Sequence, residues 1–86
     1  MNKILIGLML VSSLAFSEIE VCPFSINING IKHYKTALIN LKKYDIREAE
    51  IHLTLAKSEL EETAEAFKCS NKYLLHEIDL HLNKMR

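Results

Sequence analysis

The sequence predicts an all-α fold, a disulfide-stapled antiparallel helical hairpin with a third helix at its C-terminal end. Three observations predict it. A long amphipathic stretch, Asp45 to Cys69, follows a second apolar stretch across a connection short enough to make the two helices antiparallel. The two cysteines, Cys22 and Cys69, fall at the open end of that hairpin. A third amphipathic stretch then follows Cys69.

Residues 1–17 have the features of a secretory signal peptide. A cation at Lys3 precedes an apolar run, and the small residues Ala15 and Ser17 stand in the A-x-A relation, so cleavage is expected directly before Glu18. The apolar run is shorter than the roughly 20 residues that a helix needs to cross a bilayer. We therefore expect an exported protein in the periplasm or secreted.

The mature chain, residues 18–86, is expected to be a single small domain. Cys22 lies too far beyond the apolar run for a lipoprotein signal, so no stable membrane anchor is expected after cleavage. Removing the signal takes away one cation and no acid, which changes the formal charge from 0 to −1. Without a basic surface, no nucleic-acid partner is predicted. A domain of this size also needs a staple, a metal or a partner to support its small core.

The stretch from Asp45 to Cys69 is predicted to be one long helix. Asp45 followed by Glu48 fits an N-cap acceptor with a carboxyl group three residues later. Steps of three and four residues then give an almost wholly apolar seam, formed by Ile46, Ala49, Leu53, Ala56, Leu60, Thr63 and Phe67.

The first helix is predicted from about Pro23 to Lys43, because proline suits the first position of a helix. Residues 22–29 also alternate between apolar and polar, so an extended arm as far as Gly30 is the alternative. The connection is formed by Tyr44 and its neighbours, and we expect the tyrosine ring to cover the closed end of the hairpin.

A disulfide between Cys22 and Cys69 follows from the register of the hairpin. In an antiparallel pair the residue numbers at one height add to a constant, and the apolar positions obey this rule, with Phe24 facing Phe67 in the outermost apolar layer. The two cysteines fit the same constant as the next layer outward. Export to an oxidising compartment favours a structural disulfide over a reactive thiol.

A third helix is predicted from Asn71 to about Lys84. Cap-type residues precede a segment whose apolar side chains share one face, namely Leu74, Leu75, Ile78, Leu82 and Met85. No glycine or proline separates this segment from the second helix, so one uninterrupted helix is the alternative.

Ile51 and Leu55 lie on the opposite side of the second helix from its seam and need a cover. If the third helix folds back, Leu82 and Met85 are expected to cover Leu55 in a small three-helix bundle, which is the arrangement we favour. If the second helix continues, an exposed interaction face is expected instead, formed by Ile51, Leu55, Leu74, Ile78 and Leu82.

Histidine and glutamate residues supply only weak candidates for a metal site. Two pairs lie four residues apart on one helix face, Glu48 with His52 and Glu77 with His81. His33 and His76 are further candidate ligands. Zinc sites use three or four converging ligands, whereas a Glu and His pair at this spacing is usually a solvated surface contact. No metal site and no cofactor are therefore predicted.

One family resemblance is present in the second helix. Asp45, Ala49, Leu53 and Ala56 resemble the second helix of a tetratricopeptide repeat, where small and bulky residues recur at this spacing. The resemblance implies a peptide-docking groove between helices. The first-helix signature and a second repeat are missing, so membership of that family is not predicted.

The sequence contains no catalytic constellation and no phosphate-binding loop, and the chain is too short for a sizeable pocket, so an enzyme is not predicted. We expect a protein-binding or structural module whose protein partner is unknown. One alternative is a periplasmic metal-binding protein that uses the Glu and His pairs. The other is a helical assembly protein that associates with itself as a homo-oligomer.

Overall fold

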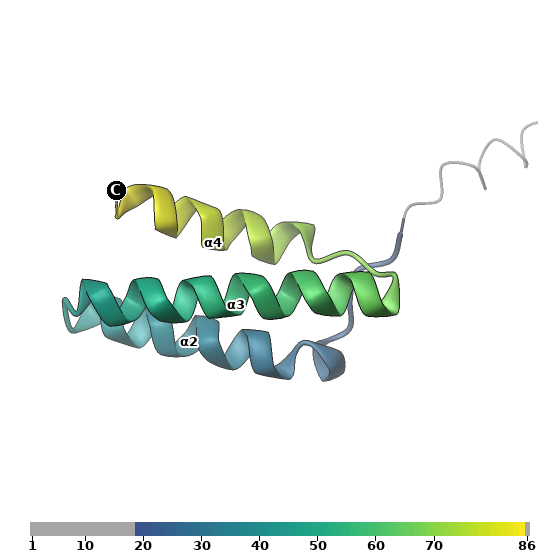
Figure 1. Ribbon diagram of the computed structural model, residues 1–86, viewed down its shortest axis with the longest axis horizontal. Helices are drawn as coiled ribbons and strands as arrows, with labels where there is room; N and C mark the ends of the chain where they lie inside the picture. The colour runs from purple at the N-terminus through teal and green to yellow at the C-terminus, as the bar shows by residue number, and fades with distance from the viewer. Residues whose placement is uncertain (1–18, 86) are drawn as a thin grey trace, which may run out of the picture.

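The computed structural model describes residues 19–85 and has the predicted all-α architecture (Figure 1). A short 3₁₀ turn, η1 (Phe24–Ile26), precedes three helices, α2 (Ile28–Lys42), α3 (Ile46–Phe67) and α4 (Lys72–Lys84). Helices α2 and α3 run antiparallel, and α4 folds back along α3. The helical hairpin with a separate third helix is thereby confirmed, whereas the predicted signal peptide lies outside the described residues.

The seam of α3 forms the centre of the core. Its four central members, Ala49, Leu53, Ala56 and Leu60, are fully buried. The predicted cap is present, since the Asp45 Oδ1 atom accepts a hydrogen bond from the backbone N–H of Glu48 at 3.3 Å. The carboxylate of Glu48 does not complete a capping box and instead lies near His52.

Small residues let α2 approach α3 closely. Gly30 and Ala37 are the buried residues of α2, and they face a seam that also contains two alanines. A methyl group added at Gly30 would lie 2.6 Å from the Cδ2 atom of Leu60, far inside van der Waals contact. Gly30 is therefore required by the close packing of the helices, although glycine weakens a helix by itself.

The predicted start of the first helix is wrong, and so is the extended alternative. Residues 24–26 form a 3₁₀ turn, and α2 begins only after Asn27. Phe24 and Ile28 are exposed, and Phe67 is 61% exposed, so the predicted aromatic layer is not part of the core. The physical reason is Asn27, whose side chain is buried in a hydrogen bond with Asn71, while its backbone N–H closes the turn on the Phe24 carbonyl.

The predicted disulfide between Cys22 and Cys69 is confirmed, with a Cα to Cα distance of 4.9 Å. Beside it, an extended segment pairs with the connection between α3 and α4 as an isolated parallel bridge between Val21 and Ser70. The Ser70 N–H donates to the Glu20 carbonyl at 2.8 Å, and the Cys22 N–H donates to the Ser70 carbonyl at 2.9 Å.

Two residues with left-handed backbone conformation end the helices of the hairpin. Tyr44 has a φ of 62° in the connection between α2 and α3, and Lys68 has a φ of 54° at the end of α3. The Lys68 turn stops α3 without glycine or proline, which is why the uninterrupted helix does not form. The expectation that the Tyr44 ring covers the closed end is wrong, because this residue is 86% exposed.

Helix α4 packs on the seam side of α3, and this corrects one prediction. Its buried residues Ile78 and Leu82 join Leu53 and Leu60 in one core cluster. Leu55 is 42% exposed and is therefore not covered by α4 in the way that the sequence predicted. One core shared by three helices removes the apolar faces of α2, α3 and α4 from water together, whereas a helix on the opposite face of α3 would need a second core.

A buried pair of asparagine side chains joins the beginnings of α2 and α4. Asn27 donates from Nδ2 to Oδ1 of Asn71 at 2.8 Å, and Asn71 donates back to Oδ1 of Asn27 at 3.0 Å. The Asn71 Nδ2 also donates to the Leu60 carbonyl of α3 at 2.9 Å. Both residues are almost fully buried, so this pair fixes how all three helices meet.

Asn71→Leu is expected to lower the free energy of unfolding by about 1–3 kcal/mol, because it leaves the Asn27 amide buried without a partner. Chemical denaturation followed by circular dichroism measures this change. The double variant Asn27→Leu/Asn71→Leu should recover much of the loss, since both polar partners are then replaced by groups of similar shape. A single variant within about 0.5 kcal/mol of wild type would show that the pair is solvated.

Candidate functional site

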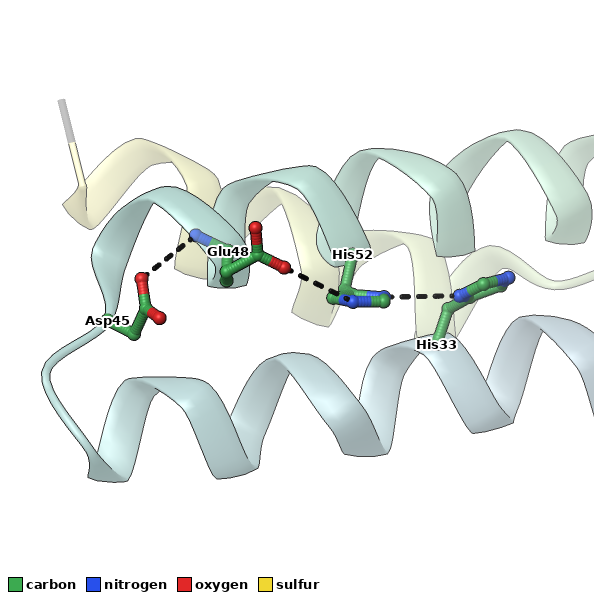
Figure 2. Close-up of polar contacts among 4 residues, drawn as sticks. All are labelled: His33, Asp45, Glu48 and His52. Atoms are coloured by element: carbon green, nitrogen blue, oxygen red, sulfur yellow. Dashed lines mark hydrogen bonds and ion pairs between the residues drawn. The ribbon is translucent and has the colours of Figure 1, made fainter.

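A row of three polar side chains crosses from α3 to α2 (Figure 2). The Glu48 Oε1 atom lies 3.8 Å from Nε2 of His52, and Nδ1 of His52 lies 3.3 Å from Nδ1 of His33. Both histidines are partly buried between the two helices. The predicted Glu48 and His52 pair is therefore brought together, and His33 from α2 joins it.

The two imidazole rings meet head-on through their Nδ1 atoms. Their centroids are 5.5 Å apart and their planes are inclined by 27°. The distance between the centroids is close to its largest possible value, which is the 3.3 Å between the two Nδ1 atoms plus the distance from Nδ1 to the centre of each ring. The two ring centres and the two Nδ1 atoms therefore lie almost on one line. In the neutral pair one Nδ1 atom must donate its hydrogen and the other must accept it.

The nearby carboxylate of Glu48 favours one of the two assignments. A carboxylate accepts hydrogen bonds only, so it favours the tautomer in which the Nε2 atom of His52 carries the hydrogen. In that tautomer the Nδ1 atom of His52 is the acceptor of the 3.3 Å contact, and Nδ1 of His33 is the donor. The order of the groups is that of the carboxylate and histidine pairs that orient ligands in metal sites, with the 3.8 Å separation being an ion-pair distance and longer than a hydrogen bond.

The second predicted pair, Glu77 and His81, does not join this row. Both lie on α4 near Tyr34 of α2, where the His81 ring centroid is 6.0 Å from that of Tyr34. Burial, and to a smaller extent the negative charge of Glu77, raise the pKa of Tyr34 above its ordinary value. Across residues 19–85, no group of three or more His, Cys, Asp or Glu side chains is placed to hold a metal ion.

The residues of the predicted interaction face do not form one surface. Ile51 and Leu55 are exposed on the outer side of α3, at 45% and 42%. Ile78 and Leu82 are buried in the bundle core, and Leu74 is packed against it. The prediction of a common face is wrong for Leu74, Ile78 and Leu82. That face required one continuous helix, whereas α4 is a separate helix that packs these residues into or against the core.

An apolar groove lies at the disulfide end of the molecule. It is lined by residues of the N-terminal segment, η1 and the end of α3, namely Glu20, Val21, Pro23, Ile26, Phe67, Lys68 and Cys69. Val21 and Phe67 are exposed there, at 66% and 61%. This groove was not predicted from the sequence, because the residues around Cys22 fit a helix or an extended arm and give no signal of a groove.

The backbone groups of Val21 lie on the side of the extended segment away from Ser70. The Glu20 carbonyl and the Cys22 N–H are both bonded to Ser70, and successive residues of an extended strand point their backbone groups in opposite directions. The N–H and C=O of Val21 therefore point away from Ser70. Neither group has a hydrogen-bond partner within residues 19–85.

No helix within residues 19–85 combines the length and the apolar composition that crossing a membrane requires. No protein-family model, no curated protein and no solved structure matches the chain.

Proposed function

We propose that the mature chain is an exported binding module that captures an extended segment of a partner protein at the disulfide end. The observation that carries this proposal is the pair of Val21 backbone groups that have no hydrogen-bond partner among residues 19–85. They lie on an exposed extended segment beside an apolar groove. An extended partner segment adds to such an edge as a further strand, with backbone hydrogen bonds for affinity and side-chain pockets for specificity.

The surroundings of Val21 suit an apolar partner segment. Phe67, Pro23 and Ile26 supply apolar surface along the groove, and their burial by a partner would contribute favourably to binding. Glu20 and Lys68 stand at the same groove with opposite charges, which favours one orientation of the partner over its reverse. The occupant that we propose is therefore an extended segment with apolar side chains on alternate residues.

The disulfide and the backbone hydrogen bonds at this end of the molecule hold the binding surface in place before a partner binds. The disulfide between Cys22 and Cys69 and the two backbone hydrogen bonds of Ser70 hold both walls of the groove. A surface ordered before binding avoids the entropy loss that ordering it during binding would cost. The disulfide is also compatible with an oxidising compartment, as expected for an exported protein.

Val21→Pro is the sharpest test of this proposal. Proline removes the outward N–H of residue 21 and leaves the Cys22 and Ser70 donors of the bridge in place. The matched control is Val21→Thr, which keeps the N–H and a β-branched side chain of similar size. Peptides are selected from a displayed random library on the wild-type protein, and their affinity for the three proteins is then measured by calorimetry.

We expect selected peptides with alternating apolar residues that bind wild type and Val21→Thr alike and lose at least tenfold in affinity for Val21→Pro, about 1.4 kcal/mol. Phe67→Ser should weaken the same peptides through the apolar wall. Circular dichroism must show unchanged helix content in each variant. Peptides that bind Val21→Pro as well as wild type would overturn the proposal. A dimer that sedimentation detects in wild type and not in Val21→Pro would identify a second copy of the chain as the occupant instead.

A further inference from the structure

We infer that His33 and His52 form a two-coordinate site for a monovalent d¹⁰ cation of the copper(I) class. The site lies between α2 and α3 and is separate from the disulfide end, so this inference does not depend on the proposed binding of a protein segment. In the metal-free protein the position of the cation is taken by the hydrogen shared between the two Nδ1 atoms.

The direction of the two nitrogens points to linear coordination. Because both ring centres and both Nδ1 atoms lie almost on one line, the electron pair that binds a metal at each Nδ1 is directed at the other ring. A cation on this line meets both pairs from opposite sides. Tetrahedral zinc needs ligand directions that converge at an angle and a set of three or four ligands, and neither condition is met here.

The distance between the nitrogens is close to the one required. Metal to imidazole nitrogen bonds are about 2.0–2.1 Å long, so a linear site needs roughly 4.1 Å between the nitrogens. The two Nδ1 atoms are 3.3 Å apart, so the rings must separate by roughly 0.8 Å at this bond length. Both side chains are only partly buried, which leaves room for small rotations of the rings.

Proton and charge balance also fit a monovalent cation. His33 frees its Nδ1 by changing tautomer, with its hydrogen moving to Nε2, so cation binding at neutral pH releases no net proton. His52 keeps its hydrogen on Nε2 towards Glu48, which leaves its Nδ1 ready to bind. The carboxylate of Glu48 carries one negative charge and balances the single charge of the cation.

The test uses silver(I), a redox-inert ion of the same charge and electron configuration, with zinc as the comparison ion. Each is titrated calorimetrically into the oxidised mature protein, and the ¹⁵N resonances of the histidine rings are followed by NMR. His33→Asn and His52→Asn each remove one nitrogen ligand and keep a polar group at the same place. The matched control is His76→Ala, which removes an exposed histidine from α4.

We expect one silver ion to bind per chain and to shift the Nδ1 resonances of His33 and His52. Both asparagine variants should lose at least tenfold in affinity, whereas His76→Ala binds as wild type does. Zinc should bind at least tenfold more weakly than silver. The inference is overturned if silver shows no saturable binding, if binding survives His33→Asn unchanged, or if zinc binds as tightly as silver.

Discussion

Replacing Cys22 and Cys69 with serine is expected to lower the free energy of unfolding by about 4 kcal/mol. The disulfide joins residues 47 positions apart, and the chain-entropy relation gives this magnitude for a loop of that length. A small domain has little stability beyond this amount, so the variant should unfold in much less denaturant than wild type. Guanidinium titration followed by far-ultraviolet circular dichroism measures the difference.

The matched control for the disulfide is wild-type protein with the bond reduced, which has the same sequence and lacks only the cross-link. It should show the same loss of stability as the double serine variant. A loss below about 1 kcal/mol in both would mean that the core of α2, α3 and α4 is sufficient by itself, and that the bond adds little restriction to the unfolded chain.

Leu60→Ala is expected to cost about 2–5 kcal/mol, the range for truncation of a buried leucine. Leu60 is fully buried, it is in the position that a side chain at Gly30 would occupy, and its carbonyl accepts the hydrogen bond from Asn71. The cavity would therefore open where all three helices meet. Thermal and chemical denaturation of the purified variant measure the loss.

Leu55→Ala is the matched control for Leu60→Ala, because it is the same substitution in the same helix at a position that is 42% exposed. It should stay within about 1 kcal/mol of wild type, since much of the Leu55 side chain already contacts water. Equal losses at the two positions would mean that α4 covers the outer face of α3, in contradiction to the exposure of Leu55.

The main helices could be predicted because their signals are local. The seam of α3, the Asp45 cap and the apolar periodicity of α4 each depend on residues within a few turns. The disulfide was predictable as well, because the sequence has two cysteines and an exported chain meets an oxidising compartment. The helix register used for it does not extend to Cys22, which lies before α2 in an extended segment. Close packing explains the failure at the start of α2, where Gly30 and Asn27 rather than Phe24 and Ile28 take the inner positions.

The position of α4 around α3 could not be predicted from periodicity alone. An amphipathic face shows that a helix needs a partner, and it does not show which side of a neighbouring helix will supply one. The Lys68 turn and the buried contact between Asn71 and Asn27 decide that direction. Both depend on residue types that also occur commonly on surfaces, so neither gives a distinctive pattern in the sequence.

The candidate sites were only partly predictable, because contacts between residues far apart in the sequence leave no distinctive local pattern. The spacing of Glu48 and His52 placed them on one face of α3, because both lie on one helix. The approach of His33 depends on the rotation of α2 about its axis, which the small residues of the interface set. The outward direction of the Val21 backbone groups arises from a bridge to Ser70 that joins distant parts of the chain.

Amide hydrogen exchange at Val21, measured residue by residue by NMR on the disulfide-bonded protein, tests most directly whether this end of the molecule receives a partner strand. In the free protein the Cys22 and Ser70 amides should be protected, because both are hydrogen-bonded, while the Val21 amide exchanges freely. A saturating selected peptide should slow exchange at Val21 and leave the centre of α3 unchanged. A Val21 amide that is already protected in the free protein, or that exchanges equally fast with the peptide bound, would contradict the proposed function.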